Sequence, residues 1–168
     1  MTINRKLKQI KTVMMDVDGV LTDGTFWWDA GDAELKRFCF SDRTGIPLAQ
    51  KAGIKIALLS GESSDNGMAI VSRYAKKLNI DDVYKGCQDK AKAVREYAAK
   101  SGFALSEICF IGDDINDLAA LKLVGFSVAP HDAHPSVLKN VDLVTKNSGG
   151  HGAVREFLDL LLAVKSKK

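Results

Sequence analysis

Residues 14–24 read MMDVDGVLTDG, an apolar run that ends in two aspartates, Asp16 and Asp18. With Ile10 and Val13 upstream, the run predicts a short buried strand that stops at the first acid. An ionised carboxylate beside a core strand is costly unless it is ion-paired, hydrogen-bonded or bound to a metal. The two acids therefore mark either an abrupt strand end or a functional site.

The rest of the chain alternates between apolar runs typical of strands and stretches with helical periodicity. Strands are predicted at residues 12–15, 54–59, 83–84, 108–111, 126–128 and 143–144. Helices are predicted at residues 45–52, 68–78, 89–100, 117–123 and 153–164. This order predicts an α/β fold, a Rossmann-like and mostly parallel sheet with helices on both faces. With 168 residues, no repeat and no linker, the chain is predicted to form one domain over residues 1–168.

One stretch interrupts this alternation directly after the first strand. Residues 25–40 read TFWWDAGDAELKRFCF, with apolar and aromatic residues on both sides of a polar centre at 29–32. The pattern predicts an inserted β-hairpin. Open α/β sheets bind ligands at the carboxyl ends of their strands, so the hairpin is expected to form a flap over that edge.

The composition argues against several classes of function. The chain has 24 Lys and Arg against 21 Asp and Glu, with much of the excess at its two ends, so no nucleic-acid partner is expected. No stretch approaches the ~20 apolar residues of a membrane span, and the first residues lack the apolar core of a signal peptide. Cys39, Cys87 and Cys109 are far apart, which favours free thiols in a reducing compartment over zinc or disulfides. A cytoplasmic protein without a membrane partner is the expectation.

Residues suited to a cation or a phosphate follow several predicted strands. They are Asp16 and Asp18, Ser60 and Gly61, Lys90 at a helix start, and Asp113, Asp114 and Asp117. A parallel sheet collects its strand ends along one edge, so these residues are expected to meet. Two like charges 4 Å apart at an effective dielectric near 20 repel by about 4 kcal/mol, and a divalent cation removes that cost. Oxygen ligands without a nearby His or Cys favour Mg²⁺ over zinc.

Such a cluster suits phosphoryl chemistry. A phosphoryl group needs several positive or hydrogen-bonding partners for its oxygens, which Mg²⁺, a hydroxyl and a lysine provide. Asp16 is predicted to attack phosphorus and carry a covalent phosphate. Asp18 is predicted to protonate the leaving alkoxide and then to take a proton from the hydrolytic water, which explains the second acid beside the first.

At this point the motifs resemble those of the haloacid dehalogenase superfamily of phosphatases. Four segments carry the resemblance in chain order: DVDGVLTDG at 16–24, Ser-Gly at 60–61, DK at 89–90 and GDDIND at 112–117. The resemblance implies a phosphomonoester hydrolase with Asp16 as nucleophile and Asp18 as acid/base. It also implies phosphate binding by Ser60, Gly61 and Lys90, Mg²⁺ binding by Asp16, Asp113 and the backbone carbonyl of Asp18, and support from Asn116 and Asp117.

A narrower resemblance covers nearly the whole chain. The hairpin, the absence of a large cap domain, DAHP at 132–135 and GGHGAVRE at 149–156 resemble the sugar-acid phosphatases of the 3-deoxy-manno-octulosonate 8-phosphate type. Such proteins are homotetramers in which the hairpins assemble into a barrel and a neighbour helps to close each site. The resemblance therefore implies a homotetramer that acts on a phosphorylated 3-deoxy-2-keto sugar acid.

Two departures from this type bear on the substrate. The octulosonate branch usually has a basic residue after the Ser/Thr-Gly pair, where this chain has Glu62, and Arg-Asp before the first helix, where it has Ser41 and Asp42. Both features resemble the 2-keto-3-deoxynononate 9-phosphate branch, whose substrate is therefore predicted, with these three residues setting specificity. An arginine would pair with a substrate carboxylate, whereas Glu62 would accept hydrogen bonds from sugar hydroxyls. The following segment SSDNG, at 63–67, looks longer than in either branch.

Other functions stay open beside this one. One alternative is 3-deoxy-manno-octulosonate 8-phosphate as the substrate, and another is a non-catalytic oligomerisation domain of a sialic-acid pathway. A signalling receiver domain also uses an aspartyl phosphate, but it places its acid pair on the first strand and the phosphorylated aspartate on a later one. His131 and His134 lie in a predicted loop without a third ligand, which favours a surface role over a metal site.

Overall fold

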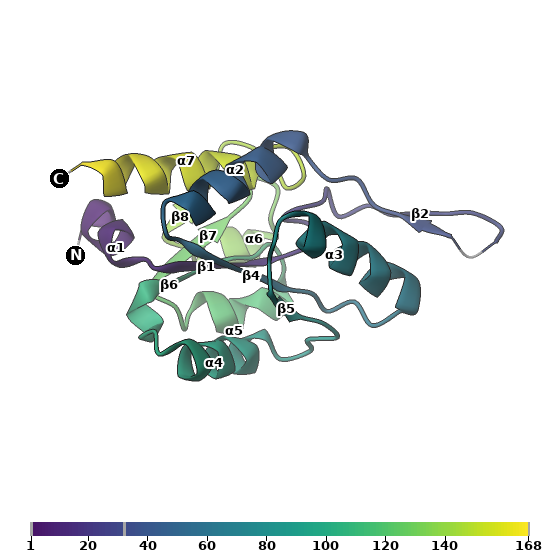
Figure 1. Cartoon of the computed structure of the whole chain (residues 1–168), viewed down its shortest axis with the longest axis horizontal. Helices are drawn as coiled ribbons and strands as arrows, with labels where there is room; N and C mark the ends of the chain where they lie inside the picture. Colours follow the sequence, from purple (N-terminus) through teal and green to yellow (C-terminus); the bar gives the residue numbers. More distant parts are fainter. Residues whose placement is uncertain (1, 32, 168) are drawn as a thin grey trace.

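The centre of the computed structural model, which describes residues 2–31 and 33–167, is a six-stranded parallel sheet (Figure 1). Its strand order is β5-β4-β1-β6-β7-β8. These strands are Thr12–Asp16 (β1), Lys55–Leu59 (β4), Asp82–Tyr84 (β5), Ile108–Ile111 (β6), Phe126–Ala129 (β7) and Leu143–Val144 (β8). β1 lies between β4 and β6 and all five of its residues are buried, which explains its continuous apolar run. The predicted α/β fold with a parallel sheet is confirmed.

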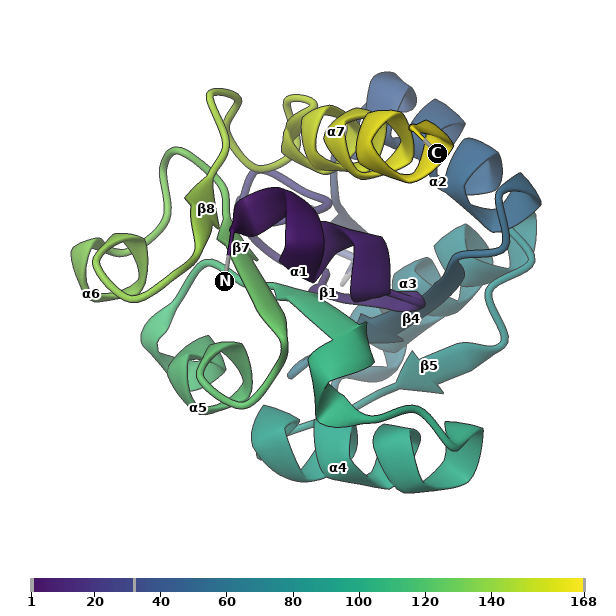
Figure 2. The ribbon, with the colours of Figure 1, turned by 90° about the vertical axis from the view of Figure 1, so that its left-hand side faces the viewer.

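Helices cover both faces of the sheet (Figure 2). One face carries Ile3–Gln9 (α1), Phe40–Lys51 (α2), Asp65–Lys77 (α3) and Ala153–Ser166 (α7). The other carries Lys90–Ser101 (α4), Leu118–Leu121 (α5) and Pro135–Leu138 (α6), with 3₁₀ turns at Leu105–Glu107 (η1) and Ile115–Asp117 (η2). Successive β1 side chains alternate between the two layers, since Val13 and Met15 pack with the first group and Met14 with the second. The sheet thus separates two cores.

All six predicted strands are present, and the helices differ from expectation at particular points. α1 and α6 were not predicted, because α1 is a two-turn lysine-rich segment that buries only Leu7, and α6 is a single turn. α2 begins five residues before the predicted start at Gly45. The segment SSDNG leads directly into α3, since Ser64 caps the helix by accepting the Gly67 N–H and Asp65 is the first helical residue.

The predicted hairpin is confirmed. Trp27–Trp28 (β2) pairs antiparallel with Glu34–Leu35 (β3), and a bridge between Thr22 and Phe38 closes the base. Figure 1 shows the hairpin extending away from the carboxyl ends of the strands, opposite the two chain ends. Its base lies beside the strand ends while both tryptophans are exposed, so only the base can wall a site there.

None of the helices in residues 2–31 and 33–167 is long and apolar enough to cross a membrane. This agrees with the hydropathy of the sequence.

Candidate active site

A cavity of about 490 Å³ opens at the carboxyl ends of β1, β4 and β6, at the base of the hairpin. The predicted site residues that line it are Asp16, Asp18, Gly61, Glu62, Lys90, Asp113 and Asn116. They come from segments up to 100 residues apart in the sequence and meet because parallel strands end on the same edge. The structure therefore brings the four sequence motifs to one place.

The ammonium group of Lys90 links two of the acids. Its Nζ lies 2.7 Å from Asp16 Oδ2 and 2.6 Å from Asp117 Oδ1, and the side chain is almost fully buried. Asp89 caps α4 by accepting the Lys92 N–H, which places Lys90 at the first helical position, directed at the end of β1. Burial lowers the pKa of Lys90, but the negative charges of Asp16 and Asp117 raise it by more than burial lowers it. The net shift is upward, so the lysine is charged.

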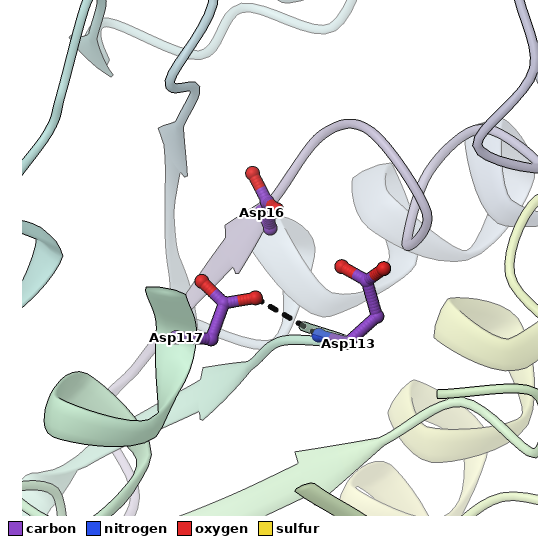
Figure 3. A group of neighbouring side chains, drawn as sticks. All are labelled: Asp16, Asp113 and Asp117. Carbon is purple, nitrogen blue, oxygen red and sulfur yellow. Dashed lines mark hydrogen bonds between the residues drawn. The ribbon is translucent and has the colours of Figure 1, made fainter. Parts of the chain in front are cut away.

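Asp117 organises the loop that carries Asp113. Its Oδ2 accepts the backbone N–H of Asp113 at 2.9 Å and that of Asp114 at 3.3 Å, the first of which is drawn in Figure 3. Its Oδ1 accepts from Lys90. Both carboxylate oxygens are therefore engaged, which fits the predicted supporting role of Asp117 better than metal binding.

Asp113 and Asp16 face each other beside this support (Figure 3). Oxygen atoms of Asp16, Asp113 and Asp117 lie within 4.8 Å of one another. Asp113 Oδ1 is buried and finds no hydrogen-bond partner among residues 2–31 and 33–167. A Cβ at Gly19, which has a φ of +88°, would overlap the Asp113 carboxylate, so the loop after β1 can approach it only as glycine.

The carboxylates of this cluster have raised pKa values, because they are buried and repel one another. Burial, followed by repulsion from Asp117, raises the pKa of Asp16 to about 7, against the lowering effect of Lys90. Burial, followed by Asp16 and Asp117, raises the pKa of Asp113 to about 8. An all-oxygen donor set with one buried, unpartnered carboxylate oxygen fits a hard divalent cation such as Mg²⁺.

Asp18, the second acid of the DVD motif, pairs with a lysine of the hairpin. Asp18 is part-exposed, and its Oδ1 lies 2.9 Å from the Nζ of Lys36, a residue of the hairpin that also lines the cavity. The sequence did not single out Lys36, because two of its three acidic partners lie 18 and 26 residues away and the intervening pattern reads only as a strand. Cys87 and Gln88, which also line the cavity, were missed for the same reason.

Comparison with known proteins agrees with this geometry. A family model of haloacid dehalogenase-like hydrolases matches residues 62–158. Over 162 residues the chain is 36% identical to the 3-deoxy-D-manno-octulosonate 8-phosphate phosphatase of Escherichia coli strain K12, covering 96% of this chain and 84% of the relative. The chain belongs to the haloacid dehalogenase-like hydrolases. The predicted family and its hydrolase class are thereby confirmed.

Solved structures of this family have the same fold. The 3-deoxy-D-manno-octulosonate 8-phosphate phosphatase of Moraxella catarrhalis, in complex with a magnesium ion, phosphate and a KDO molecule, superposes with a TM-score of 0.92 at 36% identity, covering 97% of this chain and 91% of that one. The cobalt-bound deoxy-D-mannose-octulosonate 8-phosphate phosphatase of Haemophilus influenzae superposes with a TM-score of 0.90 at 37% identity, covering 96% of this chain and 92% of that one. Two solved structural neighbours of this chain therefore contain a bound metal ion, magnesium in one and cobalt in the other.

Ser60 lies at the end of β4, where phosphate-binding residues of this hydrolase family are expected. Its side chain is buried, and its hydroxyl accepts the backbone N–H of Glu62 at 3.2 Å. Gly61 follows it at the cavity wall, where the Gln88 side chain donates to its carbonyl oxygen at 3.2 Å. Ser60 is fully buried and is not among the described residues that line the cavity, whereas Gly61 is, so phosphate binding by Ser60 stays a prediction.

The three predicted specificity residues have different surroundings. The Glu62 carboxylate accepts the N–H groups of Ser63 and Ser64, both at 2.8 Å, and lies 3.3 Å from Lys36 Nζ, so it is already engaged at the cavity wall. Ser41 and Asp42 are not among the described residues that line the cavity. Asp42 is fully buried and accepts the Arg155 N–H at 2.7 Å, which caps the first turn of α7.

Mg²⁺ is expected to raise the melting temperature of this hydrolase, and to raise it more near pH 8 than near pH 6. The pKa values of about 7 for Asp16 and about 8 for Asp113 lie above the ordinary 3.8. The folded state therefore binds more protons than the unfolded chain, and metal-free stability falls as the pH rises from about 4 to about 8. A cation offsets that loss only where the acids are ionised.

Thermal unfolding followed by circular dichroism, with and without MgCl₂ at both pH values, measures this effect. NaCl at matched ionic strength is the control. A shift in melting temperature that is equal at the two pH values, or absent from both, would contradict the prediction.

Proposed function

We propose that this chain is a Mg²⁺-dependent phosphatase of a 3-deoxy-2-keto sugar acid, and that its substrate is 3-deoxy-D-manno-octulosonate 8-phosphate. The observation that carries the proposal is the placement of Asp16, paired with the buried Lys90, beside Asp113, whose Oδ1 has no hydrogen-bond partner among the described residues, in one open cavity. The names of the Escherichia coli and Moraxella catarrhalis relatives, at 36% identity, support the choice of substrate.

The choice of the eight-carbon acid differs from the preference that the sequence suggested. The preference for 2-keto-3-deoxynononate 9-phosphate rested on Glu62, Ser41 and Asp42. Glu62 is held by two backbone amides and Lys36, which leaves little capacity for sugar hydroxyls, and Asp42 caps a helix. The curated relatives, meanwhile, carry the octulosonate name. These observations favour the alternative substrate.

In the first step of the proposed reaction, a carboxylate oxygen of Asp16 attacks phosphorus. The bond from Asp16 to phosphorus forms while the bond from phosphorus to the sugar oxygen breaks, and Asp18 gives its proton to the departing oxygen. Lys90 and the Ser60 hydroxyl bind the phosphoryl oxygens, and Asp117 holds Lys90 in place at 2.6 Å. In the second step Asp18 takes a proton from water, whose oxygen bonds to phosphorus as the bond to Asp16 breaks.

Mg²⁺ would be held by the carboxylates of Asp16 and Asp113 and the backbone carbonyl of Asp18, and it supplies positive charge to phosphoryl oxygens when bound. The protein's part is to present these oxygens in a partly buried cavity where their repulsion is relieved by a cation or by protonation.

We further propose that residues 1–168 form a single domain of this family. The expected cytoplasmic location stays a prediction.

The first test is the substrate. Purified chain with MgCl₂ should release phosphate from 3-deoxy-D-manno-octulosonate 8-phosphate with a kcat/KM at least about tenfold above that for 2-keto-3-deoxynononate 9-phosphate, a ratio within reach of differences in pocket contacts. Phosphate release is measured by a coupled colorimetric assay. A higher kcat/KM for the nine-carbon acid would restore the substrate that the sequence suggested. Activity on neither acid would remove the proposed substrate class.

The second test concerns the nucleophile. Asp16→Asn should abolish turnover, and Asp18→Asn should slow it by about 10²- to 10⁴-fold, because an amide neither attacks phosphorus nor transfers the proton. Asp81→Asn, which changes an exposed acid just before β5, is the matched control and should keep the parent rate. Turnover by Asp16→Asn near the parent rate would rule out the covalent mechanism.

We also propose that four copies of the chain associate through the hairpin. Phe26, Trp27, Trp28 and Leu35 are 52 to 71% exposed, an apolar surface that monomers seldom leave in water. Light scattering should give a tetramer, and the double substitution Trp27→Ser with Trp28→Ser should give smaller species. An active monomer at the assay concentration would contradict this arrangement.

A further inference from the structure

Lys36 is a buried lysine that the mechanism above does not use. It follows β3 on the return limb of the hairpin, and only 3% of its side chain is exposed. Its Nζ lies 2.9 Å from Asp18 Oδ1, 3.3 Å from Glu34 Oε1 and 3.3 Å from Glu62 Oε2. The three acids come from the loop after β1, from β3 and from the loop after β4. One ammonium group therefore joins three separate segments at the cavity wall.

Two of these three acids are held by groups outside the reaction. Glu62 accepts the N–H groups of Ser63 and Ser64 at the start of α3. Glu34 is nearly buried, and its Oε2 accepts from the indole N–H of Trp28 at 3.2 Å. Both therefore determine where the Lys36 ammonium lies. Asp18 is the most exposed of the three, so Lys36 is the contact that sets the orientation of its carboxylate.

We propose that Lys36 is a positioning residue that holds Asp18 for proton transfer, so that the base of the hairpin completes the catalytic site. This inference rests on the proposed phosphatase function. The Lys36 contact uses Oδ1 of Asp18, and Oδ2 exchanges the proton with the leaving sugar oxygen and then with water. A buried cation that pairs with a carboxylate fixes its direction, and misplacement of a reacting group by about 1 Å costs up to ~10²-fold in rate.

The test separates proton donation from general damage by changing the leaving group. A sugar alkoxide needs a proton to depart, whereas 4-nitrophenolate departs without one. In Lys36→Met, kcat/KM should fall about 10- to 100-fold for the sugar-acid phosphate but by less than about threefold for 4-nitrophenyl phosphate. Each kcat/KM value reports the steps up to the transfer to Asp16. Because both values are measured on the same sample, their ratio does not depend on how much of that sample is folded.

Two matched variants accompany it. Lys36→Arg keeps a positive charge that can pair with the Asp18 carboxylate, and the ratio of the two kcat/KM values should return most of the way to the parent ratio. Lys100→Met removes an exposed lysine that pairs with Asp82 at the surface, away from the cavity, and should leave the ratio unchanged. Equal losses on both substrates in Lys36→Met, or no recovery in Lys36→Arg, would overturn the role of Lys36 while leaving the phosphatase function intact. A parent protein inactive on both substrates would overturn both.

Discussion

The buried ammonium of Lys90 is the interaction on which the rest of the site depends. A parallel sheet delivers the acids of β1 and β6 to one edge, and without a cation Asp16, Asp113 and Asp117 would repel one another in a partly buried space. Lys90 pairs with Asp16 on one side and Asp117 on the other, at 2.7 and 2.6 Å. Because Asp117 also binds the amides of the Asp113 loop, this one lysine ties three motifs together.

Charge at the strand ends is balanced by two lysines from different parts of the fold. Lys90 comes from the first turn of α4, beneath the cavity, and Lys36 comes from the hairpin at its wall. The side chain of each lysine is almost completely buried, and each contacts one acid of the DVD motif, Asp16 or Asp18. The two acids therefore have separate electrostatic surroundings, which suits two separate roles in one reaction.

The sequence predicted the strands and the residues of the four motifs, because both depend on local patterns. The central strands β1 and β6 are buried on both faces and read as apolar runs, and the candidate catalytic residues lie at or just after their ends in the chain. The sequence does not show which partner a polar residue binds when that partner lies far away in the chain. Asp42 reads as a polar residue near a helix start, yet its partner is the Arg155 amide, 113 residues later. Glu62 binds amides of its own loop, but its cationic partner Lys36 lies 26 residues earlier.

By itself the sequence determined the α/β order of elements, the position of the hairpin and the set of acids that gather at the strand ends. Only the tertiary structure decided which acids are free, which are engaged and which cation faces each one. The physical reason is that hydrogen-bonding capacity is shared among neighbours in space: Asp117 uses both oxygens on Lys90 and two amides, while Asp113 keeps a buried oxygen without a described partner. The sequence specifies which hydrogen-bond donors and acceptors the chain has, and tertiary packing determines which of them bind one another.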